Sequence, residues 1–436
     1  MAERKSMIKL IKQLDWKLII IVLCIFSFGL LILSSATHAN ETGNYFQIYK
    51  QGAAFGLGML MIIGILMFDY NFLGKYYKGL YVISLILLGI VLIPGIGAER
   101  GGARSWLNLG PLDFQTSELV KLTFILSYAK IVESKKDKLN TLKEIIPVVI
   151  YAVPFIGLLF AQPDLGTAIV FCCIIAGMLF TAGLNIKLIK RVIIIAIVSL
   201  PLMYMMMASH QKERIEAFLH PDDPTYKGNY QVMQSMIAIG SGGLTGKGLY
   251  NGTQNQEGFL PVQESDFIFA VIGEELGVIG MLVVILLYTL FLLRMIILSR
   301  EAKDFYGTLI VIGVMSMFAY QIIQNIGMTV AVIPVTGVTL PFVSYGGSSL
   351  LSTMIMFGII QGLYIVREDE EAEREEKRRK KLQHEKNAKR RERELKDGSG
   401  RKTKKKSTTS DKPRFEEVPR QRTPKKARSH NQQRVR

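Results

Sequence analysis

Long apolar runs separated by short polar connections dominate the first 366 residues. The runs are about 20 residues long, which is the length an α-helix needs to cross the hydrocarbon core of a bilayer. Ten such helices are predicted, near residues 16–35, 50–69, 77–94, 116–132, 145–160, 165–182, 188–207, 266–293, 305–331 and 343–366. The pattern therefore predicts an all-α integral membrane protein and excludes a soluble globular enzyme.

Lysine and arginine are unevenly divided between alternate connections. One set of connections, which includes the N-terminus, carries 18 of them before residue 367, and the other set carries seven over longer connections. Because cytoplasmic connections hold the excess of positive side chains, both termini are predicted to be cytoplasmic. This orientation puts two long connections, near residues 94–114 and 208–265, on the extracytoplasmic side. Long loops often carry function, so we expect any chemistry there.

The formal net charge of +17 is concentrated at the end of the chain. Residues 367–436 contain 27 Lys and Arg against 14 Asp and Glu. We expect residues 1–366 to form one membrane domain and residues 367–436 a basic, mostly disordered cytoplasmic tail, whose first part could extend the last span as a polar helix. Such a tail is attracted to anionic membrane lipid, although a solvated tail that only reinforces topology explains the charge equally well. Nucleic acid is not an expected partner, because the charge needs no duplex to explain it.

Two opposite charges lie inside the fourth predicted span. Glu118 and Lys121 are three residues apart, on one face of a helix, where they can pair. A structural ion pair that locks two helices is the simpler interpretation, but ionisable groups at membrane depth are costly and are functional by default. Arg104 and Trp106 precede the pair on the outer side, so the segment is predicted to form a cationic lip over a membrane cavity.

The second long outer connection ends at Asp266, immediately before an apolar run. Between Gly240 and Gly258 it contains seven glycines, and such a loop can bring N–H groups close to a phosphate, although flexible turns explain it about as often. Asp266 either caps the following helix or serves as a reactive carboxylate. Two turns deeper, at least one of Glu274 and Glu275 is expected to face the bundle interior. The connection before the last span, residues 333–350, is rich in Pro, Gly and hydroxyls, so a shared outer site is predicted.

Five ordered segments of the chain resemble the SEDS family (shape, elongation, division and sporulation proteins). These proteins are ten-span glycosyltransferases that polymerise bacterial peptidoglycan in the cytoplasmic membrane. The segments are GARSWLNLGPLDFQTSELVKL, AQPDLGTA, AIGSGGLTGKG, SDFIFAVIGEELG and IPVTGVTLPFVSYGGSSL. Within the family, GKGLYNGTQ (residues 246–254) is more similar to the elongation branch, RodA, than to the division branch, FtsW.

The resemblance implies that Asp266 is the catalytic residue, because the family's essential aspartate falls there. The candidate substrate-binding residues are Arg104, Trp106, Glu118, Lys121, Glu264, Ser344, Gly346 and Ser348. The implied substrate is lipid II, a disaccharide-pentapeptide on undecaprenyl diphosphate. The implied partners are a class B penicillin-binding protein, which crosslinks the new strands, and other membrane proteins of the elongation complex. Many relatives have a histidine two residues before the aspartate, where this chain has Glu264, so any role of that histidine passes to Glu264 or is dispensable.

The family's change from an α-linked diphosphate to a β-1,4 glycan implies inversion by one displacement, with no tightly bound cofactor. A sugar hydroxyl is a poor nucleophile, so Asp266 is the expected general base. The leaving diphosphate needs cations, either Arg104 and Lys121 or a divalent ion such as Mg²⁺ or Mn²⁺, whose ligands the sequence does not identify. A lipid II flippase and a non-catalytic scaffold for the crosslinking enzyme are the alternatives. The concentration of polar groups in the outer half favours the enzyme over the flippase.

Overall fold

The structure, a computed structural model, describes residues 7–38, 46–67, 70–108, 113–136, 142–185, 207–221 and 225–403, with Asp223 and scattered positions between 187 and 205. Its helices are α1 (Met7–Lys12), α2 (Trp16–His38), α3 (Phe46–Leu66), α4 (Tyr70–Lys75), α5 (Tyr77–Ile90), α6 (Thr116–Glu133), α7 (Leu142–Ala161), α8 (Leu165–Thr181), α10 (Ser209–Leu219), α11 (Lys227–Gly242), α12 (Thr253–Gln256), α13 (Ile268–Glu301), α14 (Phe305–Thr329) and α15 (Gly347–Thr403). Its strands are β1 (Gly97–Arg100), β2 (Ala103–Asn108) and β3 (Asp113–Gln115).

The apolar runs form the predicted helices. Six of these are long and apolar enough to cross a membrane, namely α2, α3, α7, α13, α14 and the first part of α15, and two shorter apolar helices, α5 and α8, accompany them. The predicted fourth span is α6, and the seventh, residues 188–207, lies largely outside the described residues. The all-α class is confirmed, while the number of ten spans stays a prediction.

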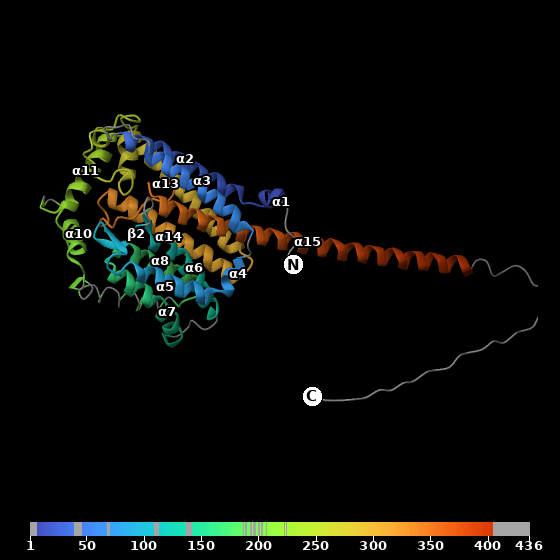
Figure 1. Ribbon diagram of the computed structural model, residues 1–436. Coiled ribbons are helices and arrows are strands. Elements are labelled where there is room, and N and C mark those ends of the chain that lie inside the picture. The colour runs from blue at the N-terminus through green and yellow to red at the C-terminus, as the bar shows by residue number, and fades with distance from the viewer. Residues whose placement is uncertain are drawn as a thin grey trace, which may run out of the picture. The chain divides into compact units, whose positions relative to one another are not determined.

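The helices pack side by side around α14, which contacts α13, α8 and α6, while α13 also contacts α2 and α11. Figure 1 shows β2, α10 and α11 at one end of this bundle and α1 and α4 at the other. Both connections predicted to be extracytoplasmic therefore lie at the same end, opposite the N-terminal helix. We call this the outer end.

The first outer connection forms a small antiparallel sheet in the order β1-β2-β3, which the sequence analysis did not predict. Arg100 pairs with Ala103 across a two-residue turn made by Gly101 and Gly102. Both glycines have positive φ, at 58° and 84°, which a tight hairpin of this length requires. β3 leads directly into α6, whose N-cap is Gln115, so the sheet fixes where that helix starts.

Helix α13 is broken at Gly277, where φ is 65° and ψ is −161°. The segment after α11 fills the break: the N–H of Val278 donates to the carbonyl of Gly243, and the N–H of Lys247 donates to the carbonyl of Glu274. A Cβ at Gly277 would lie 2.6 Å from the carbonyl oxygen of Leu244, so only glycine fits there. The break separates a short outer segment, residues 268–276, from the long membrane-crossing part of α13.

Residues 372–436 form a second compact unit. Its described part continues α15 as a polar helix up to Thr403, the alternative that the sequence left open for the start of the tail. Exposed ion pairs between successive turns join Glu376 to Lys380 at 2.6 Å and Glu375 to Arg379 at 3.7 Å. Such pairs each stabilise an isolated helix by only a few tenths of a kcal/mol. The predicted disorder of residues 404–436 concerns positions outside the described residues.

Candidate active site

Asp266 lies at the outer end of the bundle, in the turn that leads into α13. The connection between α14 and α15 holds this turn: the hydroxyl of Ser344 donates to the carbonyl of Ser265 at 2.6 Å, and the N–H of Tyr345 donates to the carbonyl of Glu264 at 2.9 Å. Two segments about 80 positions apart in the chain are therefore bonded directly. The sequence predicted that both contribute to one outer site, and the structure brings them together.

Ser344, Gly346 and Ser348 were predicted to bind substrate. In the structure, Ser344 and Gly346 are both hydrogen-bonded to the side chain of Gln51 on α3. The amide of Gln51 donates to the carbonyl of Ser344 at 3.0 Å, and its side-chain oxygen accepts the N–H of Gly346 at 3.2 Å. Ser348 is half-buried in the first turn of α15. Gln51 is a buried part of this site that sequence reasoning missed, and the signal was a glutamine at the start of an apolar helix.

The carboxylate of Asp266 does not cap α13. The N-cap is Phe267, and no side chain makes a capping hydrogen bond at this terminus. The hydroxyl of Ser265 reaches the carboxylate only at 3.4 Å, a long hydrogen bond. The capping interpretation is therefore wrong, and the role as a reactive carboxylate stays a prediction.

Burial raises the pKa of Asp266 from 3.8 to about 6, and the nearby charge of Glu264 adds to the rise. The positive charge of Arg214 and the Ser265 hydroxyl act in the opposite direction. Arg214 comes from α10, and its guanidinium donates to the carbonyl of Gly101 in the hairpin turn at 3.3 Å. A carboxylate with this pKa is largely ionised at neutral pH and is still basic enough to accept a proton, as a general base must.

Arg214 is a site residue that sequence reasoning missed. It appeared there only as one of the few positive charges on the outer side. The local sequence around it, KERIEAFL, reads as an ordinary amphipathic helix. Only the packing of α10 against the hairpin places its charge near Asp266.

Glu118 and Lys121 form the predicted ion pair, with Lys121 Nζ 2.7 Å from Glu118 Oε1, and both residues are buried. The hydroxyl of Ser352, on α15, donates to the carbonyl of Glu118 at 2.6 Å, which ties this turn of α6 to the last span. A third charge, Asp164, caps α8 by accepting the N–H of Thr167 at 3.0 Å. Burial raises the pKa of Asp164, and the charge of Lys121 opposes that rise, so Lys121 acts on two carboxylates.

Arg104 and Trp106 both lie on strand β2, whose pairing with β1 shifts in register between them. The N–H of Arg104 donates to the carbonyl of Gln162 at 3.1 Å, which anchors the strand on the turn between α7 and α8. The guanidinium of Arg100 lies over the Trp106 ring, 5.2 Å from its centroid. The predicted cationic lip is therefore a rigid strand rather than an irregular loop.

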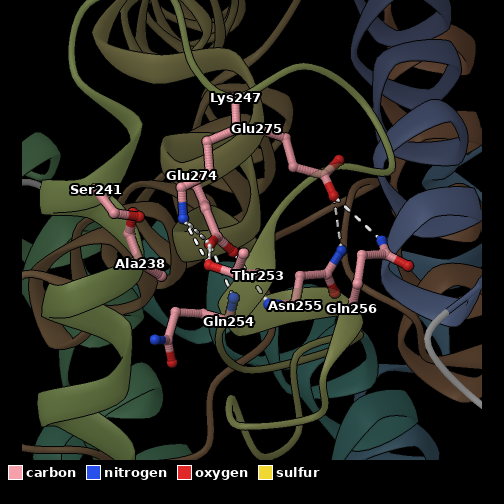
Figure 2. Close-up of polar contacts among 9 residues, drawn as sticks. All are labelled: Ala238, Ser241, Lys247, Thr253, Gln254, Asn255, Gln256, Glu274 and Glu275. Carbon is pink, nitrogen blue, oxygen red and sulfur yellow. Dashed lines mark hydrogen bonds and ion pairs between the residues drawn. The ribbon is translucent and has the colours of Figure 1, made fainter.

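The donors of the Gly-rich outer loop surround a side chain of this protein and not a phosphate, the anion that the sequence suggested as one of two alternatives. Figure 2 shows the carboxylate of Glu274 among donors from the loop. It accepts Lys247 Nζ at 2.7 Å and the backbone N–H groups of Gln254 at 2.9 Å and Asn255 at 3.0 Å. The loop and α13 are thereby fixed to each other, and these donors are occupied by an internal carboxylate rather than by a phosphate.

Glu275 anchors the same loop to α2. Its Oε1 atom accepts the hydroxyl of Ser35 at 2.6 Å. Figure 2 shows that the same carboxylate also accepts the amide of Asn255 at 2.8 Å and, through a longer bond, that of Gln256 at 3.4 Å. Both glutamates are fully buried. The expectation that at least one faces the interior is confirmed for both.

Among the residues that the structure describes, no three His, Cys, Asp or Glu side chains gather as a metal-binding group. Asp266 and Glu264 are two carboxylates close enough to influence each other. Mg²⁺ can be held by one or two carboxylates together with water and substrate phosphates, but a carboxylate that binds the ion cannot also accept the proton, so no ion ligands are assigned within the described residues.

Most of the chain is similar to known proteins. The model of the cell cycle protein family FtsW/RodA/SpoVE matches residues 15–368. The chain belongs to this family. Stage V sporulation protein E of Bacillus subtilis is 36% identical over 361 residues, covering 79% of this chain and 95% of that protein. Peptidoglycan glycosyltransferase MrdB of Escherichia coli is 33% identical over 353 residues, covering 81% and 94%.

The same fold occurs in one chain of a solved structure, which concerns the structural coordination of polymerization and crosslinking by a peptidoglycan synthase complex. It matches with a TM-score of 0.70 and 32% identity, covering 81% of this chain and 98% of that chain. This family member is therefore a multi-pass integral protein of the cytoplasmic membrane, and the resemblance found in the sequence is confirmed. Relatives from sporulation and from the MrdB group are similarly close, so assignment to the elongation branch stays a prediction.

Proposed function

We propose that this chain is a peptidoglycan glycosyltransferase that polymerises lipid II into β-1,4 glycan strands on the outer side of the cytoplasmic membrane, with Asp266 as its general base. One observation supports the base assignment above all: the half-buried carboxylate of Asp266 caps no helix and has a pKa raised to about 6. Membership of a family that includes glycosyltransferases supports the reaction class.

In the proposed reaction, the 4-hydroxyl oxygen of the acceptor sugar attacks the anomeric carbon of the donor. The new glycosidic C–O bond forms as the bond from that carbon to the diphosphate breaks, which inverts the configuration. The hydroxyl proton passes to Asp266, and undecaprenyl diphosphate leaves with the electron pair of the broken bond. The rigid turn that carries Asp266 places the base before substrate arrives, which lowers the cost of orientation.

The leaving diphosphate develops negative charge that nearby cations must stabilise. Arg214 already acts on Asp266, and Arg104 lies on β2 at the same outer end of the bundle. Lys121 is paired with Glu118, so we assign it the weaker contribution. A divalent ion, if bound together with the diphosphate, would supply further charge stabilisation.

We propose a class B penicillin-binding protein as the partner. The fold match to a peptidoglycan synthase complex that coordinates polymerization with crosslinking supports this assignment. The segment GKGLYNGTQ supports an elongation role, with other membrane proteins of the elongation complex as further partners. The basic residues that follow Val366 support an attraction to anionic membrane lipid.

The test is polymerisation of fluorescent lipid II by the purified chain in proteoliposomes, alone and with its penicillin-binding partner. Glycan polymer that appears with wild type and is lost with Asp266→Asn is the expected result. Movement of lipid II between leaflets without polymer would favour the flippase. Polymer formed only by an added polymerase would favour the scaffold.

A further inference from the structure

Asn325, on α14, is fully buried beside the turn that carries Asp266. Its side-chain amide donates both hydrogens: one to the carbonyl of Asp266 at 3.0 Å and one to the carbonyl of Val338 at 2.9 Å. One side chain therefore joins the turn before α13 to the connection between α14 and α15. No sequence motif marked this residue for such a role, since its polar face on α14 is explained equally well by ordinary interhelical bonding.

The two carbonyls belong to chain segments that flank the Asp266 carboxylate. One is the peptide of Asp266 itself. The other follows Gly337, whose φ is 72° and where an added Cβ would lie 3.6 Å from Asp266 Oδ2. The backbone at Gly337 thus forms one wall beside the carboxylate, and Asn325 fixes the distance between this wall and the peptide that carries the side chain.

The carbonyl of Asp266 needs such a donor because the helix does not supply one at this point. The N–H of Ala270, four residues on, donates instead to the carbonyl of Phe267 at 2.9 Å. A buried carbonyl without a partner costs about 1–3 kcal/mol. The side chain of Asn325 satisfies it, so the position of this carbonyl depends on a residue from another helix.

We propose that Asn325 is the positioning residue for Asp266, holding the carboxylate and the Gly337 wall in the geometry that proton transfer requires. This inference rests on the proposed role of Asp266 as the base. Asn325 itself contacts neither substrate nor the reacting atoms in this scheme. A displacement of about 1 Å at a reacting group can lower the rate about 100-fold, which sets the expected size of the effect.

The chain offers a closely matched control in the adjacent residue. Gln324 is also buried, with 2% of its surface exposed, and its amide donates to a carbonyl of the same connection, that of Pro334, at 2.8 Å. Within the part of the chain that the structure describes, the Gln324 side chain makes no hydrogen bond to the Glu264–Asp266 turn. Asn325→Leu and Gln324→Leu thus remove the same kind of bond from the same pair of segments, and only the first releases Asp266.

The experiment measures initial rates of lipid II polymerisation in proteoliposomes against substrate concentration and pH, together with thermal stability in detergent. We expect Asn325→Leu to lower kcat about 10- to 100-fold and to change KM less than about threefold. Gln324→Leu should keep kcat within about threefold of wild type, although its loss of Tm should be comparable to that of Asn325→Leu. Losses of kcat that are equal in the two variants and follow Tm would overturn the proposal, as would a normal kcat in Asn325→Leu.

The pH profile gives a readout that general destabilisation would not move. Arg214, Glu264 and the hydroxyl of Ser265 are the groups that influence the Asp266 carboxylate. Separation of the Gly337 wall from the turn admits water, which weakens the burial effect, so the acidic limb of the kcat profile in Asn325→Leu should move to lower pH. If the acidic limb of the kcat profile stays at the same pH in Asn325→Leu, this result would contradict a positioning role for Asn325. If Asn325→Leu does not insert, Asn325→Ser against Gln324→Ser replaces the pair with the same expectations.

Failure of this inference can be told apart from failure of the proposed function. If Asp266→Asn polymerises normally, the base assignment fails, and with it any role of Asn325 through that base. If Asp266→Asn is inactive and Asn325→Leu keeps its kcat and its pH limb, only the positioning role fails.

Discussion

The substitution Asp266→Asn distinguishes catalysis from structure because the two side chains have nearly the same size and differ in their ability to take a proton. A correctly placed general base contributes typically 10²- to 10⁴-fold in rate. Polymer formation should therefore fall by that factor, which corresponds to about 3–5 kcal/mol in the activation barrier. Binding of lipid II and of the penicillin-binding partner should persist, since neither depends on proton transfer.

The same substitution should not destabilise the protein. The pKa of this carboxyl rises from 3.8 to about 6 on folding, so its ionised form is less favourable in the folded protein than in the unfolded chain. Its ionisation therefore lowers the free energy of unfolding by on the order of 3 kcal/mol above pH 6, and this effect vanishes below about pH 3.8. The contribution of this carboxyl to the free energy of unfolding thus falls as pH rises from about 3.8 to about 6. Partial exposure of Asp266 reduces the penalty through solvent screening, so we expect Asp266→Asn to gain about 1–2 kcal/mol at pH 7.5 and little at pH 4.5.

The assay pairs glycan polymer formation with Tm in detergent at pH 7.5 and 4.5. Glu264→Gln is the matched control, because it removes a neighbouring half-buried carboxylate. The charge of Glu264 raises the pKa of Asp266, so Glu264→Gln should move the acidic limb of the rate, expected near pH 6 in the wild type, to lower pH. Near-normal polymerisation by Asp266→Asn, or a Tm loss that is larger at pH 7.5 than at pH 4.5, would refute the reasoning.

Three further predictions concern other parts of the chain. Glu118→Gln removes the ion-pair partner of Lys121 at membrane depth at a cost of about 2.5–3.5 kcal/mol, so membrane yield and Tm should fall. The double variant Glu118→Gln with Lys121→Met should recover both membrane yield and Tm. If the double variant also recovers polymerisation, Lys121 has no role in catalysis. Gly277→Ala should destabilise by on the order of 3 kcal/mol in thermal denaturation, unlike Gly157→Ala, where a Cβ meets open space. Truncation after Glu371 removes only the second unit and should leave polymerisation by the inserted protein unchanged, whereas lost turnover would tie that unit to the reaction.

Hydrophobic periodicity predicted the membrane helices well because a span needs little beyond length and apolar composition. The Glu118–Lys121 pair was predictable for a similar reason, since spacing along one helix decides the contact. The outer sheet was missed although the sequence carried its signal. Two glycines, Gly101 and Gly102, separate short segments, and this is a recognised hairpin pattern.

The site itself was only partly predictable. Asp266 could be placed beside an outer cavity, but its failure to cap α13 depends on where that helix begins, and this is decided by packing. Arg214 and Asn325 reach the site from helices distant in sequence. The occupant of the Gly-rich loop could not be foreseen either. Glycines and hydroxyls predict an anion, and only the fold shows that Glu274 supplies it.

The outer segment of α13, residues 268–276, is anchored by buried polar groups at both of its ends. At its start, Asn325 and Ser344 bond the turn that carries Asp266. At its end, Glu274 and Glu275 bond the Gly-rich loop and α2. A buried polar group that loses its partner is strongly unfavourable, so this segment cannot shift at one end without leaving such groups unsatisfied. The break at Gly277 frees the segment from the direction of the membrane-crossing helix, and the two anchors then determine its position. The geometry around Asp266 is therefore fixed before substrate binds, which is the condition under which a base and its neighbouring charges act most strongly on a transition state.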